Sequence, residues 1–264
     1  MGHLDTILMP IELSDTHCHL EQLDAGALDE AAAAGVTTIV AVAQDASSMR
    51  AILDLASRFP GRVLPGLGIH PCTVTDRGLE ALAPDLTLLT ERAADAAVIG
   101  ETGLDHKSAV SAAQQAEQER LLERHFEIAE SHHTPVNLHS RRCLRRTLER
   151  AVAFHRATGI AVQMHWFTES KKLIRICNDE DIFVSAGPTV VGDEQAAAAA
   201  CEIADDLLLL ESDAPVSVGG RPGHPRRVRE IAEKLAVLRG VTLEALAAQL
   251  ASNLRRYLSG SMTN

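Results

Sequence analysis

Two histidines separated by one residue, His17 and His19, are the first side chains whose type and spacing suit metal chemistry. Along an extended strand, residues two apart point to the same side, and Cys18 between them points to the opposite side. Both imidazoles can therefore reach one metal ion. An isolated His-x-His arises by chance in about one such chain in two. The pair therefore indicates a metal site only in combination with other ligands.

Four more side chains could complete such a site: Glu101, His139, His165 and Asp213. The two oxygens of Glu101 can bridge two ions, and His139 and His165 can serve the second ion. Asp213 can bind a metal and also accept a proton from an attacking water. We therefore predict catalytic roles for Glu101 and Asp213. Mixed nitrogen and oxygen ligands suit zinc or manganese, and magnesium where water completes the shell, so two divalent ions are expected.

Short apolar or β-branched runs alternate with longer amphipathic stretches along the whole chain. The predicted strands are Ile11–Asp15, Val36–Val42, Val63–Gly68, Ala97–Glu101, Val136–His139, Ala161–His165, Ile182–Ala186 and Leu207–Glu211. The clearest predicted helices are Ala46–Arg58, Ala112–Ser131, Cys143–Thr158, Glu169–Asp179, Asp193–Ala204, Pro225–Arg239 and Leu243–Leu258. This alternation predicts parallel strands joined by right-handed crossovers, and eight units favour a closed (β/α)8 TIM barrel.

No linker, charge block or low-complexity tract interrupts the pattern. We therefore predict a single domain over residues 1–264, with its core at about 11–258. No Gly-x-Gly-x-x-Gly follows the first strand, which argues against a dinucleotide-binding fold.

The positions of the candidate ligands in this predicted barrel strengthen the case that they form one metal site. Residues just past the carboxyl ends of barrel strands converge on one site. In chain order these positions hold His17, His19, His70, Glu101, Asp105, His139, His165 and Asp213. Any one of them alone is more often a structural or surface residue. Their joint placement predicts one metal site at the barrel mouth.

The segments around these residues resemble the motifs of the TatD family of metal-dependent hydrolases and deoxyribonucleases, in the same order. The matching segments are Asp15-Thr16-His17-Cys18-His19, Gly68-Ile69-His70-Pro71, Gly100-Glu101-Thr102-Gly103-Leu104-Asp105, His139-Ser140-Arg141, His165-Trp166-Phe167 and Glu211-Ser212-Asp213-Ala214-Pro215. The likeness runs from Ile11 to about Leu258, and Asn253 and Tyr257 fit the family's closing helix. It implies that the metal ligands are His17, His19, Glu101, His139, His165 and Asp213. It also implies a metal-dependent deoxyribonuclease of the exonuclease type, or a related phosphodiesterase.

The departures from the family concern substrate more than metal. After Asp213 the family commonly carries an Arg-Asn-Glu-Pro run, whereas this chain has Arg221-Pro222-Gly223-His224-Pro225. Trp166 stands where the family often has Cys, and Arg142 where it often has Asp. These changes put the exact substrate in doubt and leave the hydrolytic core intact.

Four residues are predicted to bind substrate: His70, Arg141, Arg221 and Trp166. A guanidinium fork matches a phosphate, which favours Arg141. We expect the loops carrying Arg141, Arg221 and Arg226 to gather around the metals and form a small positive mouth. Trp166 could pack in the core or offer a stacking surface for a base.

Net charge and composition restrict which kinds of partner the protein is expected to bind. The net charge of −11 argues against a broad basic footprint on nucleic acid, although metal ions can supply local positive charge. The family resemblance implies that the substrate is DNA, either single-stranded or at 3′ ends. The five cysteines are far apart and lack a Cys-x-x-Cys pair, which indicates reduced thiols in a cytoplasmic protein. Neither a membrane-spanning run nor a signal peptide is visible, so no membrane partner is expected. Oligomeric state is left open.

Two alternative functions remain. A small-molecule amidohydrolase, lactonase or esterase on the same barrel would share the His-x-His opening. Many such enzymes bridge their metals with a modified lysine at the end of the fourth strand, where this chain has Glu101. A barrel without catalytic activity is disfavoured by the complete ligand set. The sequence does not separate DNA, RNA and small molecules as substrates.

Four further histidines, His125, His132, His133 and His155, fall on predicted helices. We expect all four to be surface or helix-end residues without a part in the chemistry.

Overall fold

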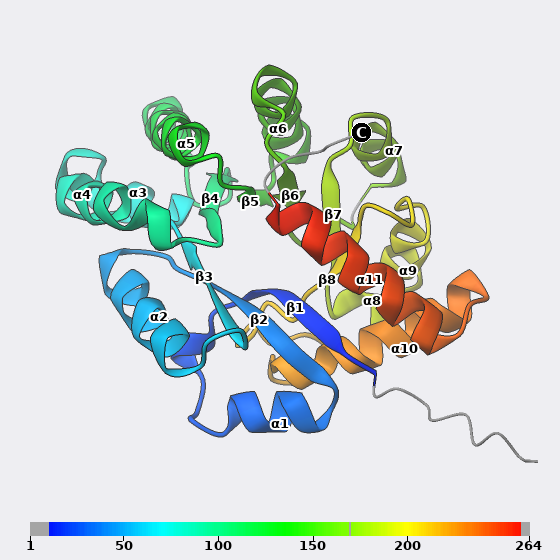
Figure 1. The fold of residues 1–264 in the computed structure, drawn as a ribbon. Coiled ribbons are helices and arrows are strands. Elements are labelled where there is room, and N and C mark those ends of the chain that lie inside the picture. Colours follow the sequence, from blue (N-terminus) through cyan, green and yellow to red (C-terminus); the bar gives the residue numbers. More distant parts are fainter. Residues whose placement is uncertain (1–10, 169, 260–264) are drawn as a thin grey trace, which may run out of the picture.

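A computed structural model describes residues 11–168 and 170–259 as a barrel of eight parallel strands, confirming the predicted fold (Figure 1). The strands are β1 (Leu13–Cys18), β2 (Val36–Val42), β3 (Val63–Leu67), β4 (Val98–Asp105), β5 (Val136–Arg141), β6 (Val162–Met164), β7 (Phe183–Ala186) and β8 (Leu208–Leu210). They follow one another in chain order, and each pairs with the next. All eight predicted strands are present. β4 and β5 extend beyond their predicted ends at Glu101 and His139.

The connecting helices form an outer layer around the strands (Figure 1). They are α1 (Ala27–Ala33), α2 (Ala46–Arg58), α3 (Pro71–Arg77), α4 (Ala83–Arg92), α5 (Ala112–His132), α6 (Leu144–Thr158), α7 (Lys171–Asp179), α8 (Thr189–Gly192), α9 (Glu194–Ala200), α10 (Val228–Arg239) and α11 (Leu243–Leu258). Four 3-10 turns are η1 (Leu20–Gln22), η2 (Glu80–Leu82), η3 (Ala93–Asp95) and η4 (Pro225–Arg227). The predicted start of one helix at Glu169 lies outside the described residues.

Local sequence explains these elements. Strands such as β2 and β8 are largely apolar because both faces are buried, one in the barrel and one under the helices. β1, β4 and β5 also carry polar residues, several of which contribute to the site described below. Asp45 and Ser48 form a capping box at the start of α2, and Ser111 and Gln114 form another at α5.

The barrel is closed between β8 and β1 by single hydrogen bonds, since no ladder joins these two strands in the described part of the chain. Asp213 donates its N–H to the His17 carbonyl (3.0 Å), and His19 donates to the Ala214 carbonyl (2.8 Å). The Asp15 carboxylate accepts hydrogen bonds from the backbone N–H and the hydroxyl of Ser212. This seam holds the His-x-His strand beside the loop that carries Asp213.

Helix α11 closes the amino-terminal end of the barrel. The side chain of Asn253 donates to the carbonyls of Asp205 (2.7 Å) and Leu208 (2.8 Å), just before and within β8. Tyr257 is buried against Phe183, with ring centroids 5.4 Å apart. Among the described helices none alone is long and apolar enough to cross a membrane. The consecutive segments Pro225–Arg239 and Leu243–Leu258 reach that length and composition only as a pair bent by 111°.

The prediction that His125 is a surface residue is wrong. His125 lies on the buried face of α5, where its Nδ1 donates to the Leu121 carbonyl (2.8 Å) and its Nε2 accepts from the Ile69 N–H (2.9 Å). A helical pattern alone does not reveal such a partner, because Ile69 lies 56 residues earlier in the chain.

Candidate metal centre

Side chains in or just after seven of the eight strands meet in a pocket of about 350 Å³ at the carboxyl end of the barrel. Five of the six predicted ligands line it: His19, Glu101, His139, His165 and Asp213. The sixth, His17, is fully buried directly behind them. The barrel thus brings all six side chains together.

Glu101 lies at the centre of the group. Its Oε2 is 3.6 Å from His17 Nε2 and 3.5 Å from His19 Nε2. Its Oε1 is 2.8 Å from His139 Nδ1 and 3.2 Å from His165 Nε2. Each carboxylate oxygen therefore faces its own pair of imidazole nitrogens.

Asp213 completes the first of these two donor groups. Its Oδ1 lies 3.5 Å from His17 Nε2 and 3.6 Å from His19 Nε2. The residue has a φ of 48°, in the left-handed region that Asp adopts more readily than most residues. This backbone turn after β8 carries the carboxylate to the pocket.

Hydrogen bonds made by the Nδ1 atoms of His17 and His19 determine which ring nitrogen can bind a metal. His17 Nδ1 donates to the Asn137 side-chain oxygen (2.8 Å), and His19 Nδ1 donates to the Val42 carbonyl (3.1 Å). Both protons are therefore on Nδ1, so each Nε2 presents a lone pair towards Glu101. His17 Nε2 and Glu101 Oε2 are buried and have no hydrogen-bond partner among the residues that the structure describes. Such unpaired buried atoms fit a bound cation, because leaving them unsatisfied is unfavourable.

His139 and His165 each have a carboxylate near the ring nitrogen that points away from Glu101. His139 Nε2 is 3.3 Å from Asp105 Oδ2, and His165 Nδ1 is 3.5 Å from Glu211 Oε1. In both cases the opposite ring nitrogen faces Glu101. A carboxylate behind a histidine orients the ring and raises its basicity as a ligand.

Sequence reasoning assigned no role to Asn137 or Glu211. Both are fully buried, in β5 and directly after β8. The signal available for both was a buried-type position for a polar side chain: Asn137 lies within the predicted strand Val136–His139, and Glu211 ends the otherwise apolar predicted strand Leu207–Glu211. The hydrogen-bond partner of Asn137 could not be read from the sequence, since Asn137 and His17 are 120 residues apart.

His70 differs from the other histidines of the pocket. It caps α3, where its Nδ1 accepts the Cys72 N–H (3.0 Å). A neutral ring must then carry its proton on Nε2, which lies 3.4 Å from Glu101 Oε1. The donor atoms of His70, Glu101 and His139 are close enough to surround one ion. We nevertheless assign His70 as a hydrogen-bond donor, because its Nε2 lone pair is occupied by that proton.

Burial and neighbouring charge set the protonation of the cluster. Burial alone would raise the pKa of the Glu101 carboxyl, but the surrounding histidines outweigh it and hold that pKa well below its ordinary value. Burial lowers the pKa of His19 to about 4, against the opposing effect of Glu101. Glu101 is thus ionised and His19 is neutral, the forms in which these side chains bind metal. Neighbouring carboxylates outweigh burial at His17, His139 and His165 and raise the pKa of each.

A glycine in β4 allows the strands to approach closely. Gly103 has a φ of 141°, and a Cβ there would lie 2.1 Å from the His139 carbonyl oxygen. Any side chain at this position would push β5 away and move His139 with it.

The predicted substrate residues divide into two groups. His70, Arg141 and Trp166 line the pocket. Trp166 is half-buried, and its Nε1 donates to the Thr189 hydroxyl (3.1 Å). Arg221 does not line the pocket, because its guanidinium donates to both Glu230 oxygens (2.8 and 2.7 Å). Arg226 is likewise paired, with Glu30 (2.6 Å), so the expected gathering of both arginines around the metals is wrong.

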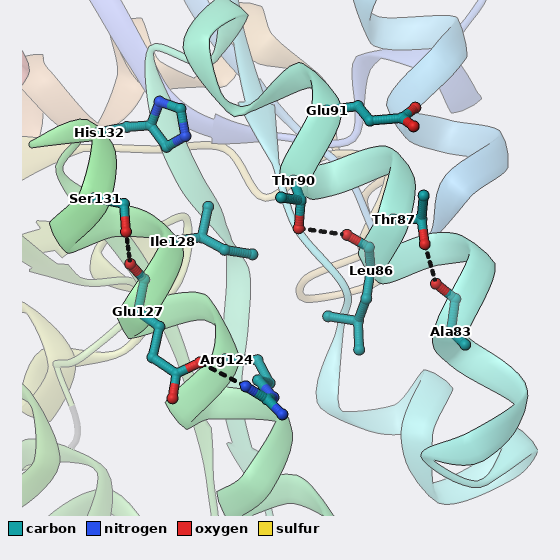
Figure 2. Close-up of a pocket in the computed structure, with 10 residues that line it drawn as sticks. All are labelled: Ala83, Leu86, Thr87, Thr90, Glu91, Arg124, Glu127, Ile128, Ser131 and His132. Carbon is teal, nitrogen blue, oxygen red and sulfur yellow. Dashed lines mark hydrogen bonds and ion pairs between the residues drawn. The ribbon is translucent and has the colours of Figure 1, made fainter.

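A second hollow, of about 620 Å³, lies between α4 and α5 on the outside of the barrel (Figure 2). Its Thr87, Thr90 and Ser131 hydroxyls each donate to a backbone carbonyl of their own helix. Arg124 is paired with Glu127 (2.8 Å). No polar group converges on a common point there, so we assign it no chemistry.

The geometry agrees with comparisons to known proteins. The family model described as TatD related DNase matches residues 14–259. The chain belongs to the TatD family of metal-dependent hydrolases. It is 30% identical to the uncharacterized metal-dependent hydrolase YcfH of Escherichia coli, over 92% of this chain and 94% of that protein. It is 27% identical to deoxyribonuclease TATDN3 of Homo sapiens, over 89% and 90% of the two chains.

Solved structures confirm the family fold. The TatD homologue YJJV of Escherichia coli superposes with a TM-score of 0.79 at 26% identity, covering 95% of this chain and 98% of that one. Organophosphorus hydrolase from Deinococcus radiodurans superposes with a TM-score of 0.65 at 13% identity, covering 94% and 92% of the two chains. That second likeness shows the fold alone.

Proposed function

We propose that this TatD-family hydrolase is a deoxyribonuclease of the exonuclease type that uses two divalent ions, magnesium, manganese or zinc. One observation carries the proposal: the two oxygens of Glu101 face separate pairs of histidine nitrogens. A carboxylate in this position can bridge two cations. Two cations side by side suit the displacement at a phosphodiester.

The first donor group would consist of His17, His19, Glu101 and Asp213, and the second of Glu101, His139 and His165. Cations bound there would activate a water and neutralise the charge that builds up on the phosphoryl oxygens.

The remaining steps belong to the protein's own side chains. Asp213 accepts the proton of the attacking water, since its carboxylate lines the pocket beside the first donor group. His70 donates a hydrogen bond from its Nε2–H to a phosphoryl oxygen, and the Arg141 guanidinium binds another. Trp166 offers the exposed part of its indole to a base, while its Nε1 stays anchored on Thr189.

A substrate panel tests the proposal. Metal-stripped protein is loaded with magnesium, manganese or zinc and assayed on single-stranded DNA, duplex DNA, RNA, carboxylic esters and lactones. We expect cleavage of DNA from strand ends, faster on short single strands than on long blunt duplexes. Turnover of esters or lactones without cleavage of any nucleic acid would replace the proposal with a small-molecule hydrolase.

A further inference from the structure

Beside the metal pocket, the turn from β5 into α6 forms an open hollow of about 810 Å³. The basic residues that line it are His106, Lys107, Arg141, Arg142, Arg145 and Arg146. Glu149 is the one acidic residue among its lining. Arg141 lines both this hollow and the metal pocket, so the two cavities are adjacent. We call this surface the basic hollow.

Most of the cationic side chains in the basic hollow have no carboxylate partner among the described residues. Many arginines elsewhere on the barrel are bound to carboxylates, as Arg156 is to Glu180 and Arg229 to Glu233. Arg146 at the edge of the hollow is bound to Glu119. The other cationic residues of the hollow differ. Lys107, Arg141, Arg142 and Arg145 are exposed, and none of them has an ion pair or a side-chain hydrogen bond within the described residues.

The start of α6 adds to this excess of positive charge. Its N-cap, Cys143, makes no side-chain capping bond, and its first turn contains no acidic residue. Arg145 and Arg146 stand in that turn, where the helix dipole disfavours cations. An anion placed there would interact favourably with both the helix terminus and the guanidinium groups.

We propose that the basic hollow binds the sugar-phosphate backbone of a single DNA strand whose scissile phosphate occupies the metal pocket. This inference rests on the proposed nuclease function and adds the path of the polymer. Guanidinium groups bind phosphates in bidentate fashion and carry no base information, so the contact is independent of sequence. The remaining surface of a chain with net charge −11 repels phosphates, which confines the strand to this path.

The test uses Arg142→Ala/Arg145→Ala, which removes two unpaired charges and leaves Arg141 in place. Binding is measured by fluorescence anisotropy on metal-stripped protein with labelled oligothymidylate of about twelve and about three nucleotides. We expect the variant to bind the longer strand about tenfold more weakly. Binding of the shorter strand should change little. The slope of log K against log salt should become shallower by about 1.4, corresponding to two lost contacts on a single strand.

A matched control removes two unpaired charges far from the hollow. Lys234 and Arg255 are exposed on α10 and α11, without ion pairs among the described residues, and α11 closes the opposite end of the barrel. Lys234→Ala/Arg255→Ala should bind both strands as the wild type does. Arg142→Lys/Arg145→Lys should retain most binding, which separates loss of charge from a folding defect.

The outcomes distinguish this inference from the proposed function. Equal binding of the longer strand by wild type and by Arg142→Ala/Arg145→Ala overturns the inference, and so does an equal loss in the control. Wild-type protein that binds neither strand also overturns it. If the wild type binds the longer strand through these arginines but cleaves no DNA with any metal, the proposed function fails and the basic hollow stands.

Discussion

At the level of single residues, the position of one proton decides what each histidine of the pocket does. His17 and His19 each donate from Nδ1 and turn a free Nε2 towards Glu101. His70 accepts at Nδ1 and turns an N–H towards the same carboxylate. The hydrogen-bond partner of each Nδ1 therefore determines whether the nitrogen that faces Glu101 offers a lone pair or a proton.

Asp213→Asn tests the assignment of the proton acceptor. The amide keeps an oxygen that can bind metal but cannot accept a proton near neutral pH. We expect kcat on a short single strand to fall by about 10²- to 10⁴-fold, with oligonucleotide binding changed only modestly. Metal content is measured on the same sample to exclude loss of ions. A variant that keeps more than about a tenth of the wild-type rate would refute the role.

His70→Ala tests whether this ring is a donor and not a ligand. Loss of a hydrogen bond to a charged oxygen should lower kcat/KM by about 10- to 100-fold. The number of metal ions per chain, measured by elemental analysis, should stay at the wild-type value. His17→Ala is the matched control, and it should lose metal. If His70→Ala also loses an equivalent of metal, His70 is a ligand and the tautomer argument fails.

Residue type and position in the sequence predict much of this site, but they do not predict which side chains pair with one another. Strand-end placement singles out His17, His19 and Glu101 because a barrel must gather those positions. Arg221 also falls in a mouth loop, yet Glu230, nine residues later, binds its guanidinium. Sequence position shows which loop a side chain occupies. It does not show which neighbour neutralises that side chain.

At the level of elements, the strands were easier to predict than their ends. The prediction ended β4 at Glu101, and polar and glycine residues follow that position. The strand continues to Asp105, since those polar side chains are buried in the site and Gly103 lets β5 approach. The short helices α3 and α4, of 7 and 10 residues, were not among the clearest predicted helices. Length alone does not explain this, since α7 and α9, of 9 and 7 residues, fall within predicted helices.

Helix α5 carries a pH-dependent contribution to stability. Burial lowers the pKa of His125 to about 4 from its usual 6.5, outweighing the hydrogen bond to the Leu121 carbonyl. Between these values the unfolded chain binds a proton that the folded chain does not, so stability falls as the pH drops from 6.5 towards 4. The full effect is about 3 kcal/mol.

Chemical denaturation of wild type and His125→Gln across this pH range checks the prediction. The amide oxygen of Gln can still accept the Ile69 N–H but does not titrate. The advantage of the wild type over the variant at pH 7 should shrink by about 3 kcal/mol at pH 4. Parallel stability curves for the two proteins would show that His125 does not contribute in this way.

At the level of the whole molecule, the charge beside the metal pocket is opposite in sign to the net charge of the chain. The chain carries a net charge of −11, yet unpaired cations lie beside the metal pocket. The net charge of −11 predicts no broad basic face. It could not locate the basic hollow, because pairing depends on which helices lie side by side, as α5 and α6 do through Glu119 and Arg146.

The central claim is that two ions bridged by Glu101 hydrolyse DNA. The most direct measurement is cleavage of a short labelled single strand by metal-stripped protein as manganese is added in stoichiometric steps. The account predicts no cleavage without metal, and a rate that rises to a plateau at two equivalents per chain. A plateau at one equivalent would contradict the two-ion arrangement. Absence of cleavage at every ratio, by protein shown to bind manganese, would contradict the nuclease function itself.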